Sequence, residues 1–473
     1  MAGVYDVLIV GNGILAETLI FKLQRKNSSL KVAIIGRRSR LGSASKAAGA
    51  MINAWCELTP NHLENPLLEK RFQVTRRGAE SWTNFAKEIS EITAKKIEVK
   101  RGTFLILTQK STEFETNSFR YIAKKVRENN IEHQKILASD LPWLESSCDV
   151  EAIYIKDDGY IDSRLALKSL DLANKKLGVE IFDDEVTELK LKKSSREIVT
   201  KSGAKFSAKN IVLANGSFAQ ALLDQNPEVA REIPRLFFGI GSGLDFSLAA
   251  ESDPEILKLD AVVRTADRGN SCSFHLIPYG NGKFYAGASS LLSPIPDFAP
   301  TAYATQSVLD SLINEINGGF AKANIAFRGV GFRPTSADTF PLLGETNVKG
   351  LWMLNGTKRD GFTMSAYLSE QLAKNILGET HELPQEFKPC RKLISYKNKE
   401  HAIKDAELMH ISADAQHGGI GAPYAINKRD EMRHNEIVKI YDRRNLGDFG
   451  IHPELLHLYD SDEFYAKMTS KNK

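Results

Sequence analysis

The chain has 473 residues, which exceeds the length at which one hydrophobic core keeps growing, so we expect two domains or one domain with large insertions. Hydrophobic residues make up 42% of the chain and charged residues 26%, which excludes a disordered or fibrous protein. The formal net charge of +4 is too small for this length to indicate a nucleic-acid partner. No apolar run approaches 18 residues and no leader pattern precedes the first one, so we expect no membrane span and a cytoplasmic protein.

The N-terminal segment has the pattern of a βαβ unit. Residues 4–10 form a short apolar run typical of a strand, a glycine turn follows, and residues 18–27 carry apolar side chains at helical spacing. Residues 31–35 form a second strand-like run. This order predicts two parallel strands joined by a right-handed helical crossover.

The middle of the chain does not continue this alternation. Residues 67–91 and 112–129 are predicted to be helical, and residues 101–108 to form a strand. Residues 209–216 are predicted as a strand that ends in glycine, which is typical of a nucleotide-binding sheet. Residues 350–377 return to strand, glycine turn and helix. A nucleotide-binding unit is therefore expected to be built from separate stretches of the chain.

Closely spaced strand-like runs between residues 258 and 292 indicate a mostly antiparallel sheet. The predicted fold class is α/β, with a Rossmann-type nucleotide domain interleaved with an antiparallel substrate domain and followed by a C-terminal helical extension. The predicted boundaries are 1–65, 150–225 and 330–380 for the nucleotide domain, 66–149 and 226–329 for the substrate domain, and 381–473 for the extension.

A dinucleotide-binding pattern, Gly11-x-Gly13-x-x-Ala16, lies directly after the first strand and opens the helix. The first glycine permits the tight turn, the second lets the backbone approach a pyrophosphate, and the small third residue packs the helix on the strand. The helix N-terminus stabilises the negative charge. The sequence therefore predicts that a dinucleotide binds here.

The acidic residue that usually follows the second strand and bonds the ribose hydroxyls is missing, because the chain has Gly36, Arg37 and Arg38 at that place. Two interpretations remain open on these residues. Either Arg37 or Arg38 meets a ribose phosphate, as in an NADP site, or another group holds the ribose of FAD.

The next stretches resemble the D-amino-acid oxidase superfamily, and especially its glycine oxidase branch. Residues 42–51 are similar to the small-residue loop that passes the pyrophosphate and the flavin ring in that family. Five further segments are similar to family motifs in the same order along the chain. They are residues 101–105 (RGTFL), 158–162 (DGYID), 208–217 (AKNIVLANGS), 331–344 (GFRPTSADTFPLLG) and 356–361 (GTKRDG).

The resemblance implies a flavoprotein that binds FAD rather than NADP. It implies no covalent link, because neither Cys272 nor Cys390 falls within the C-terminal motifs, and no metal site. The residues that we expect to contact FAD are Gly11, Gly13, Ile14, Leu15, Arg37, Arg38, Ser43, Ser45, Lys46, Ala48, Gly49, Met51, Val186, Ala214, Gly216, Arg333, Arg359, Asp360, Gly361, Phe362 and Thr363.

Three residues are predicted to face the substrate. Arg333 matches the family arginine that grips the carboxylate of an amino acid, a task that suits the two parallel donors of a guanidinium. Arg359 matches a second arginine beside the active site, and His275 stands where glycine oxidases carry a tyrosine. Lys46 and Arg264 are weaker candidates, each equally compatible with a solvated basic side chain.

The four cysteines and the histidines of the last 90 residues give no metal pattern. Cys56, Cys148, Cys272 and Cys390 lie far apart, which favours free thiols in a reducing compartment. Seven histidines lie in the extension without HxH, HxxH or HExxH spacing, and we expect helices that pack on the core or contact another subunit or a partner. These histidines are His381, His401, His410, His417, His434, His452 and His457.

The predicted function is the FAD-dependent oxidation of a small amine or amino acid to an imine, with the electrons passed to oxygen. Two alternatives stay open. One is a dehydrogenase of a substrate without an amine, such as a hydroxy acid, and the other is a flavin-binding subunit that acts through its C-terminal extension.

Overall fold

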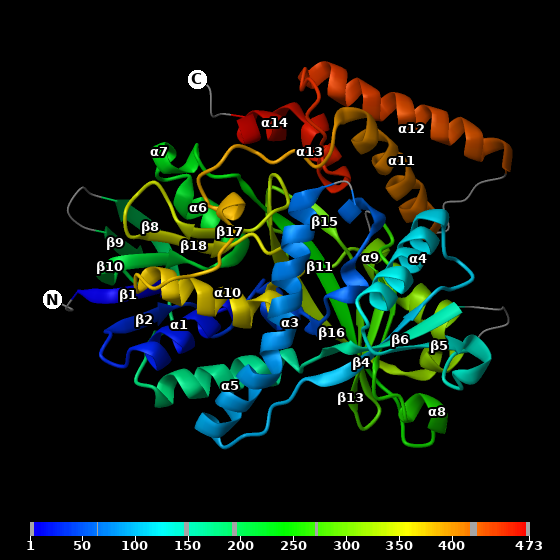
Figure 1. Cartoon of the computed structure of the whole chain (residues 1–473), viewed down its shortest axis with the longest axis horizontal. Helices are drawn as coiled ribbons and strands as arrows, with labels where there is room; N and C mark the ends of the chain where they lie inside the picture. Colours follow the sequence, from blue (N-terminus) through cyan, green and yellow to red (C-terminus); the bar gives the residue numbers. More distant parts are fainter. Residues whose placement is uncertain are drawn as a thin grey trace.

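A computed structural model describes residues 4–63, 65–145, 151–191, 196–269, 273–416 and 423–469. Two β-sheets lie side by side, and the helices of the C-terminal extension pass across one end of both (Figure 1). Cys148, Cys272 and His417 lie outside the described residues. Within the described part of the chain, no helix combines the length and the apolar character that crossing a bilayer requires.

The first sheet contains the predicted βαβ unit, because its first two strands pair in parallel, from Val7 opposite Val32 to Val10 opposite Ile35. The strand order is β17-β18-β10-β1-β2-β7. Strand β9 also pairs with β10, and β8 pairs with β9, which extends the sheet. Its strands are β1 (Tyr5–Val10), β2 (Val32–Ile35), β7 (Glu180–Phe182), β8 (Val186–Leu191), β9 (Arg196–Thr200), β10 (Lys205–Leu213), β17 (Leu342–Glu345) and β18 (Leu351–Asn355).

Alternation along β1 divides the core between the two faces of this sheet. Val7 and Ile9 point to one face and join a cluster with the helices that cover it, whereas Leu8 and Val10 point to the other. The helices on the first face are α1 (Ile14–Lys26), α3 (Pro66–Thr93), α5 (Ser163–Lys176) and α10 (Gly361–Ile376). Gly78 permits a close approach of α3 and α10, since a Cβ there would lie 2.3 Å from the carbonyl oxygen of Thr363.

The second sheet is mostly antiparallel, as predicted, and among its described strands only β4 and β12 pair in parallel. Residues 151–160 belong to this sheet, because β6 pairs with β3, β4 and β5. The boundary that we predicted at residue 150 for the nucleotide unit therefore lies too early at this strand. The strands are β3 (Met51–Ile52), β4 (Lys100–Ile106), β5 (His133–Leu137), β6 (Glu151–Tyr160), β11 (Leu236–Ser247), β12 (Val262–Thr265), β13 (His275–Gly280), β14 (Lys283–Gly287), β15 (Leu291–Ser293) and β16 (Asn324–Ser336).

Six further helices of the described residues, four of them only four or five residues long, lie between the strands along the chain. The turn at α2 lies against β16, with an isolated bridge between Ser43 and Phe332. These helices are α2 (Ala44–Ala47), α4 (Glu113–Glu128), α6 (Ala219–Leu223), α7 (Pro227–Ala230), α8 (Pro254–Leu257) and α9 (Ala302–Ser311).

The C-terminal extension is part of the main core. Phe387 stacks on Phe340, with ring centroids 5.5 Å apart, and Tyr441 and Leu458 are buried in the cluster that includes α1 and α3. The predicted helical character is confirmed by α11 (Lys399–Gln416), α12 (Pro423–Arg444), α13 (Leu456–Asp460) and α14 (Asp462–Thr469). Its predicted contact with another subunit or partner stays a prediction.

Candidate functional site

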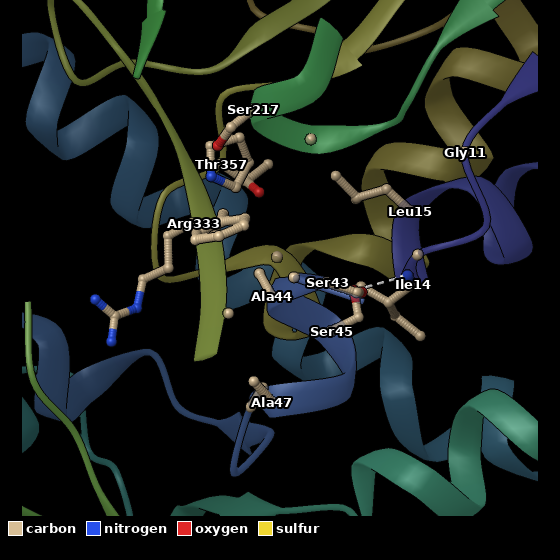
Figure 2. A pocket seen from close by; sticks show the side chains of 18 of the residues that line it. Gly11, Ile14, Leu15, Ser43, Ala44, Ser45, Ala47, Ser217, Arg333 and Thr357 are labelled. Carbon is tan, nitrogen blue, oxygen red and sulfur yellow. Dashed lines mark hydrogen bonds between the residues drawn. The ribbon is translucent and has the colours of Figure 1, made fainter. Parts of the chain in front are cut away.

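A cavity of about 470 Å³ lies between the two sheets. Its lining extends from the end of β1 and the start of α1 to β11, β13 and β16 of the second sheet. Figure 2 shows Gly11 and Arg333 at opposite sides of this space, with the α2 turn between them. Two sheets thus contribute to one elongated site.

The predicted dinucleotide turn forms one end of the cavity. Gly11 has φ = +108°, and a Cβ there would lie 2.7 Å from the carbonyl oxygen of Ala214 at the end of β10. Only glycine fits this close approach. Gly13 is the N-cap of α1 and has no side chain that could accept a hydrogen bond. The hydroxyl of Ser45 instead accepts one from the backbone N–H of Ile14 at 3.0 Å (Figure 2). The helix N-terminus therefore faces the cavity, as an anion site requires.

Asn12 explains the missing acidic residue at position 36. Its side-chain amide donates to the carbonyl oxygen of Arg37 at 2.9 Å, which places the Asn12 side chain directly beside Gly36. A Cβ at Gly36 would lie 2.6 Å from Asn12 Cγ. The space that an acidic side chain would need is therefore filled by Asn12, so this chain meets the ribose region with a different set of groups.

The basic residues around this end differ in placement. Arg37 lines the cavity and lies 3.5 Å from the Glu185 carboxylate. Arg38, whose side chain is 68% exposed, pairs with Asp183 and does not line the cavity. Lys46 is exposed, donates to the carbonyl oxygen of Ser39 and does not line it either. The side chains of Arg38 and Lys46 thus turn toward partners outside the cavity, and their predicted contact with FAD stays a prediction.

The remaining predicted residues all contribute to the cavity lining. They are Gly11, Gly13, Ile14, Leu15, Arg37, Ser43, Ser45, Ala48, Gly49, Met51, Val186, Ala214, Gly216, His275, Arg333, Arg359, Asp360, Gly361, Phe362 and Thr363.

Arg333 on β16 provides a donor at the other end of the cavity. Its Nη2 donates to the carbonyl oxygen of Ser289 at 2.7 Å, which fixes the guanidinium. Its Nη1 is buried and has no hydrogen-bond partner among the described residues. A buried donor without a partner is costly, so such a group is expected to meet a ligand.

Arg359 also lines the cavity, but carboxylates of the protein hold it. Its Nη2 donates to Glu454 Oε1 at 2.7 Å, and its Nη1 lies 3.4 Å from Asp267 Oδ2. The neighbouring Lys358 donates to the same oxygen of Glu454 at 2.9 Å. Glu454 belongs to the C-terminal extension, so the extension reaches the wall of the site.

The charged side chains of Arg264 and Glu57 act on His275. Arg264, predicted as a possible solvated residue, is fully buried and donates to Glu57 Oε1 at 2.5 Å and to the hydroxyl of Ser273 at 2.8 Å. Glu57 lines the cavity and 24% of its side chain is accessible there. Burial and the positive charge of Arg264 lower the pKa of His275 to about 3, so His275 is a neutral ring at ordinary pH.

Sequence reasoning did not find Glu57, because no motif contains it. The structure shows its support: the Asp158 carboxylate accepts hydrogen bonds from the backbone N–H groups of Ala54, Trp55 and Cys56. These bonds fix the turn that carries Glu57 into the cavity. The signal available in the sequence was Asp158 in the 158–162 motif, whose role could be seen only once its partners were placed.

A second buried histidine gives a pH-dependent prediction. Burial lowers the pKa of His62 from 6.5 to about 4, so between these values the unfolded chain binds one more proton at this site than the folded chain. Folding stability from this group is therefore lost as pH falls below 6.5, by about 1.4 kcal/mol per pH unit down to about pH 4. His62→Gln should reduce the fall of the unfolding free energy between pH 6.5 and 5, measured by urea unfolding, by about 2 kcal/mol. Parallel curves for the two proteins would contradict the prediction.

Comparison with known proteins identifies the family of the chain. The family model described as FAD dependent oxidoreductase matches residues 6–375, which include every residue of the cavity lining. The chain belongs to this family.

Three relatives match this chain over at least 90% of their own length. An uncharacterized oxidoreductase, YurR of Bacillus subtilis, is 24% identical over 394 residues, covering 80% of this chain and 96% of that protein. A glycine oxidase of Geobacillus kaustophilus is 24% identical over 375 residues, covering 76% of this chain and 90% of that protein. The crystal structure of glycine oxidase from Geobacillus kaustophilus superposes with a TM-score of 0.69 at 22% identity, covering 82% and 99% of the two chains.

The FAD-dependent oxidoreductase therefore uses FAD, and the cavity fits this cofactor. Asn215 lines the cavity, and its buried side-chain oxygen has no hydrogen-bond partner among the described residues. Such an acceptor is expected where a bound group completes the hydrogen bonding. The helix N-terminus at Gly13 lines the cavity and suits the pyrophosphate, and α2 contributes the small residues Ala44, Ser45 and Ala47 to the lining. Of the described cysteines, neither Cys56 nor Cys390 lines the cavity, and non-covalent attachment stays a prediction.

Proposed function

We propose that this FAD-dependent oxidoreductase oxidises the C–N bond of a small amino acid or amine to an imine and passes the electrons to oxygen. Bound FAD supplies the chemistry by accepting a hydride from the carbon next to nitrogen. We also propose that the first sheet holds the cofactor and the second sheet presents the substrate. The names of the relatives support an amine substrate, because one of them is a glycine oxidase.

The proposal rests mainly on the buried Nη1 of Arg333. Arg333 lines the cavity, its buried Nη1 lacks a partner in the described chain, and its guanidinium is held in place through Nη2 on Ser289. A guanidinium gives a carboxylate strong charge-assisted hydrogen bonds and fixes its orientation. A substrate carboxylate on Arg333 would hold the reacting carbon in one position, which lowers the barrier by orientation.

His275 contributes a neutral surface rather than a base. Its ring lies 5.6 Å from the ring of Tyr285, its Nδ1 is 3.2 Å from the carbonyl oxygen of Ser273, and its pKa of about 3 makes it a weak proton acceptor. We therefore propose that His275 does not take a proton from the substrate amine and that the amine binds in its neutral form. Activity is then expected to rise with pH while the amine titrates.

The experiment is reduction of the flavin without oxygen. Purified protein in its oxidised, yellow form is mixed anaerobically with glycine, alanine, N-methylglycine or other small amino acids, and the flavin absorbance is followed. Bleaching by an amino acid supports the proposal. Bleaching by hydroxy acids alone would replace it with dehydrogenation of a substrate without an amine. Readmission of air then tests the acceptor, because rapid recovery of colour with hydrogen peroxide formation identifies an oxidase.

A further inference from the structure

We propose that Glu454 of the C-terminal extension neutralises the inner wall of the substrate cavity and so makes the enzyme select substrates with a single carboxylate. The inference rests on the proposed function, since it names the substrate class for the same site. Four observations support it: the contacts of Glu454, its place behind the wall, the charges around it and the single donor left on Arg333.

Glu454 holds both cations of the wall through one oxygen. Its Oε1 accepts from Lys358 Nζ at 2.9 Å and from Arg359 Nη2 at 2.7 Å. All three groups are largely buried: the Glu454 side chain is 4% exposed and the Lys358 side chain 8%. Although burial alone would raise it, the pKa of Glu454 is held well below its usual range by Lys358 and Arg359. The carboxylate is therefore ionised at all ordinary pH values and offsets part of the positive charge of these two cations.

Glu454 reaches this place from a fixed turn of the extension. It lies in the 3-10 helix η8 (Pro453–Leu455), and its backbone N–H donates to His452 Nδ1 at 3.3 Å. Burial lowers the pKa of His452 well below its usual value, so this ring stays neutral and can accept that bond. The turn is thus built to deliver a carboxylate.

The Glu454 carboxylate lies on the far side of Lys358 and Arg359 from the main cavity. Lys358 and Arg359 line both the main cavity and a second, smaller cavity of about 100 Å³, whereas Glu454 lines only the second. It leaves the volume of the main cavity unchanged and alters the charge of its wall. Arg359 therefore presents to a substrate a guanidinium that is already paired.

Further acidic groups reinforce this effect. Asp267 lies 3.4 Å from Arg359 Nη1, and Glu57 lines both cavities with its accessible carboxylate. Burial would raise the pKa of Glu57, but Arg264 and Arg359 lower it, so Glu57 is also an anion. A second carboxylate of a substrate would meet Glu57 in the main cavity, and among the described residues the cations of the lining other than Arg333 are paired with protein carboxylates. Among the described residues that line the main cavity, Arg333 Nη1 is the one side-chain donor nitrogen that is buried without a protein partner, which is enough for one carboxylate.

The test uses carboxylates that the enzyme does not oxidise. Propionate and succinate are titrated into the FAD-loaded full chain, and dissociation constants are taken from the change in the flavin spectrum. We expect propionate to bind the wild-type protein at least tenfold more tightly than succinate. Glu454→Gln keeps a hydrogen-bond acceptor but removes the charge, and should tighten succinate about tenfold while changing propionate less than twofold.

The control is Glu463→Gln, because Glu463 lies in the same extension, is exposed and pairs only locally with Lys467. It should behave as the wild type. The proposal is overturned if the wild-type protein binds succinate as tightly as propionate, or if Glu454→Gln shifts both ligands by the same factor. The wild-type comparison decides even if the variant does not accumulate as a folded flavoprotein.

The assay also separates this inference from the proposed function. Because neither ligand is turned over, selectivity for propionate can be observed even if no amino acid bleaches the flavin, and then only the proposed reaction fails. Bleaching by amino acids together with equal binding of the two ligands would overturn the inference alone. Absence of propionate binding would remove the carboxylate seat at Arg333 and so overturn both.

Discussion

Replacing Arg333 by alanine is expected to lower kcat/KM for the amino-acid substrate by about 10²- to 10³-fold while FAD stays bound. The size follows from the loss of a buried charge-assisted pair with the substrate carboxylate, which costs about 3–4 kcal/mol in comparable sites. FAD content is expected to persist because the dinucleotide turn at Gly11 lies at the other side of the cavity (Figure 2). Steady-state kinetics and the flavin absorbance per protein measure the two quantities.

Three further variants make this result specific. Arg333→Lys keeps the charge but loses the planar pair of donors, so it should recover only part of the activity. Gly241→Ala leaves Arg333 in the chain but would place a Cβ 2.2 Å from its Nη2, so it should lower kcat/KM by moving the guanidinium. Arg231→Ala changes an exposed arginine and should have no effect. Activity lost in parallel with FAD would show that Arg333 supports the cofactor instead.

Most of the residues that the motifs predict for the cofactor line the cavity, because each motif is local. The turn at Gly11, the α2 loop and the start of α10 are short segments whose backbone meets the cavity directly, so their spacing along the chain already specifies their role. Arg38 and Lys46 belong to the same segments but do not line the cavity. Which of two adjacent side chains turns inward depends on partners such as Asp183, which no local pattern reveals.

The contacts that the sequence did not predict join residues far apart in the chain. Arg359 and Glu454 are separated by 95 positions, and Glu454 lies beyond residue 375, where the family match ends. Arg264 and Glu57 are separated by 207 positions. The exchange of an acidic residue at position 36 for the side chain of Asn12 is likewise visible only when the two strands are paired. Such pairings require the tertiary fold.

Arg391→Ala is expected to lower the free energy of unfolding by about 3–5 kcal/mol, the usual cost of removing one partner from a buried ion pair. Arg391 donates through Nε and Nη2 to the two oxygens of Asp338 at 3.0 and 2.9 Å, and Asp338 is fully buried. Its remaining donors bond the carbonyl oxygens of Phe340, Pro341 and Lys388. Urea unfolding followed by tryptophan fluorescence measures the change.

The expected loss depends on the extension being part of the core, so matched variants test that point. Arg443→Ala removes a half-exposed arginine of the same extension, which pairs with Asp460, and should cost about 1 kcal/mol or less. In the double variant Arg391→Ala/Asp338→Asn the uncompensated buried charge is gone, so part of the stability should return. If the extension packed only as a surface appendage, Arg391→Ala would cost no more than Arg443→Ala. A cost several times larger means that the segment beyond the family match stabilises the turn that follows β16 at Asp338, five residues from Arg333.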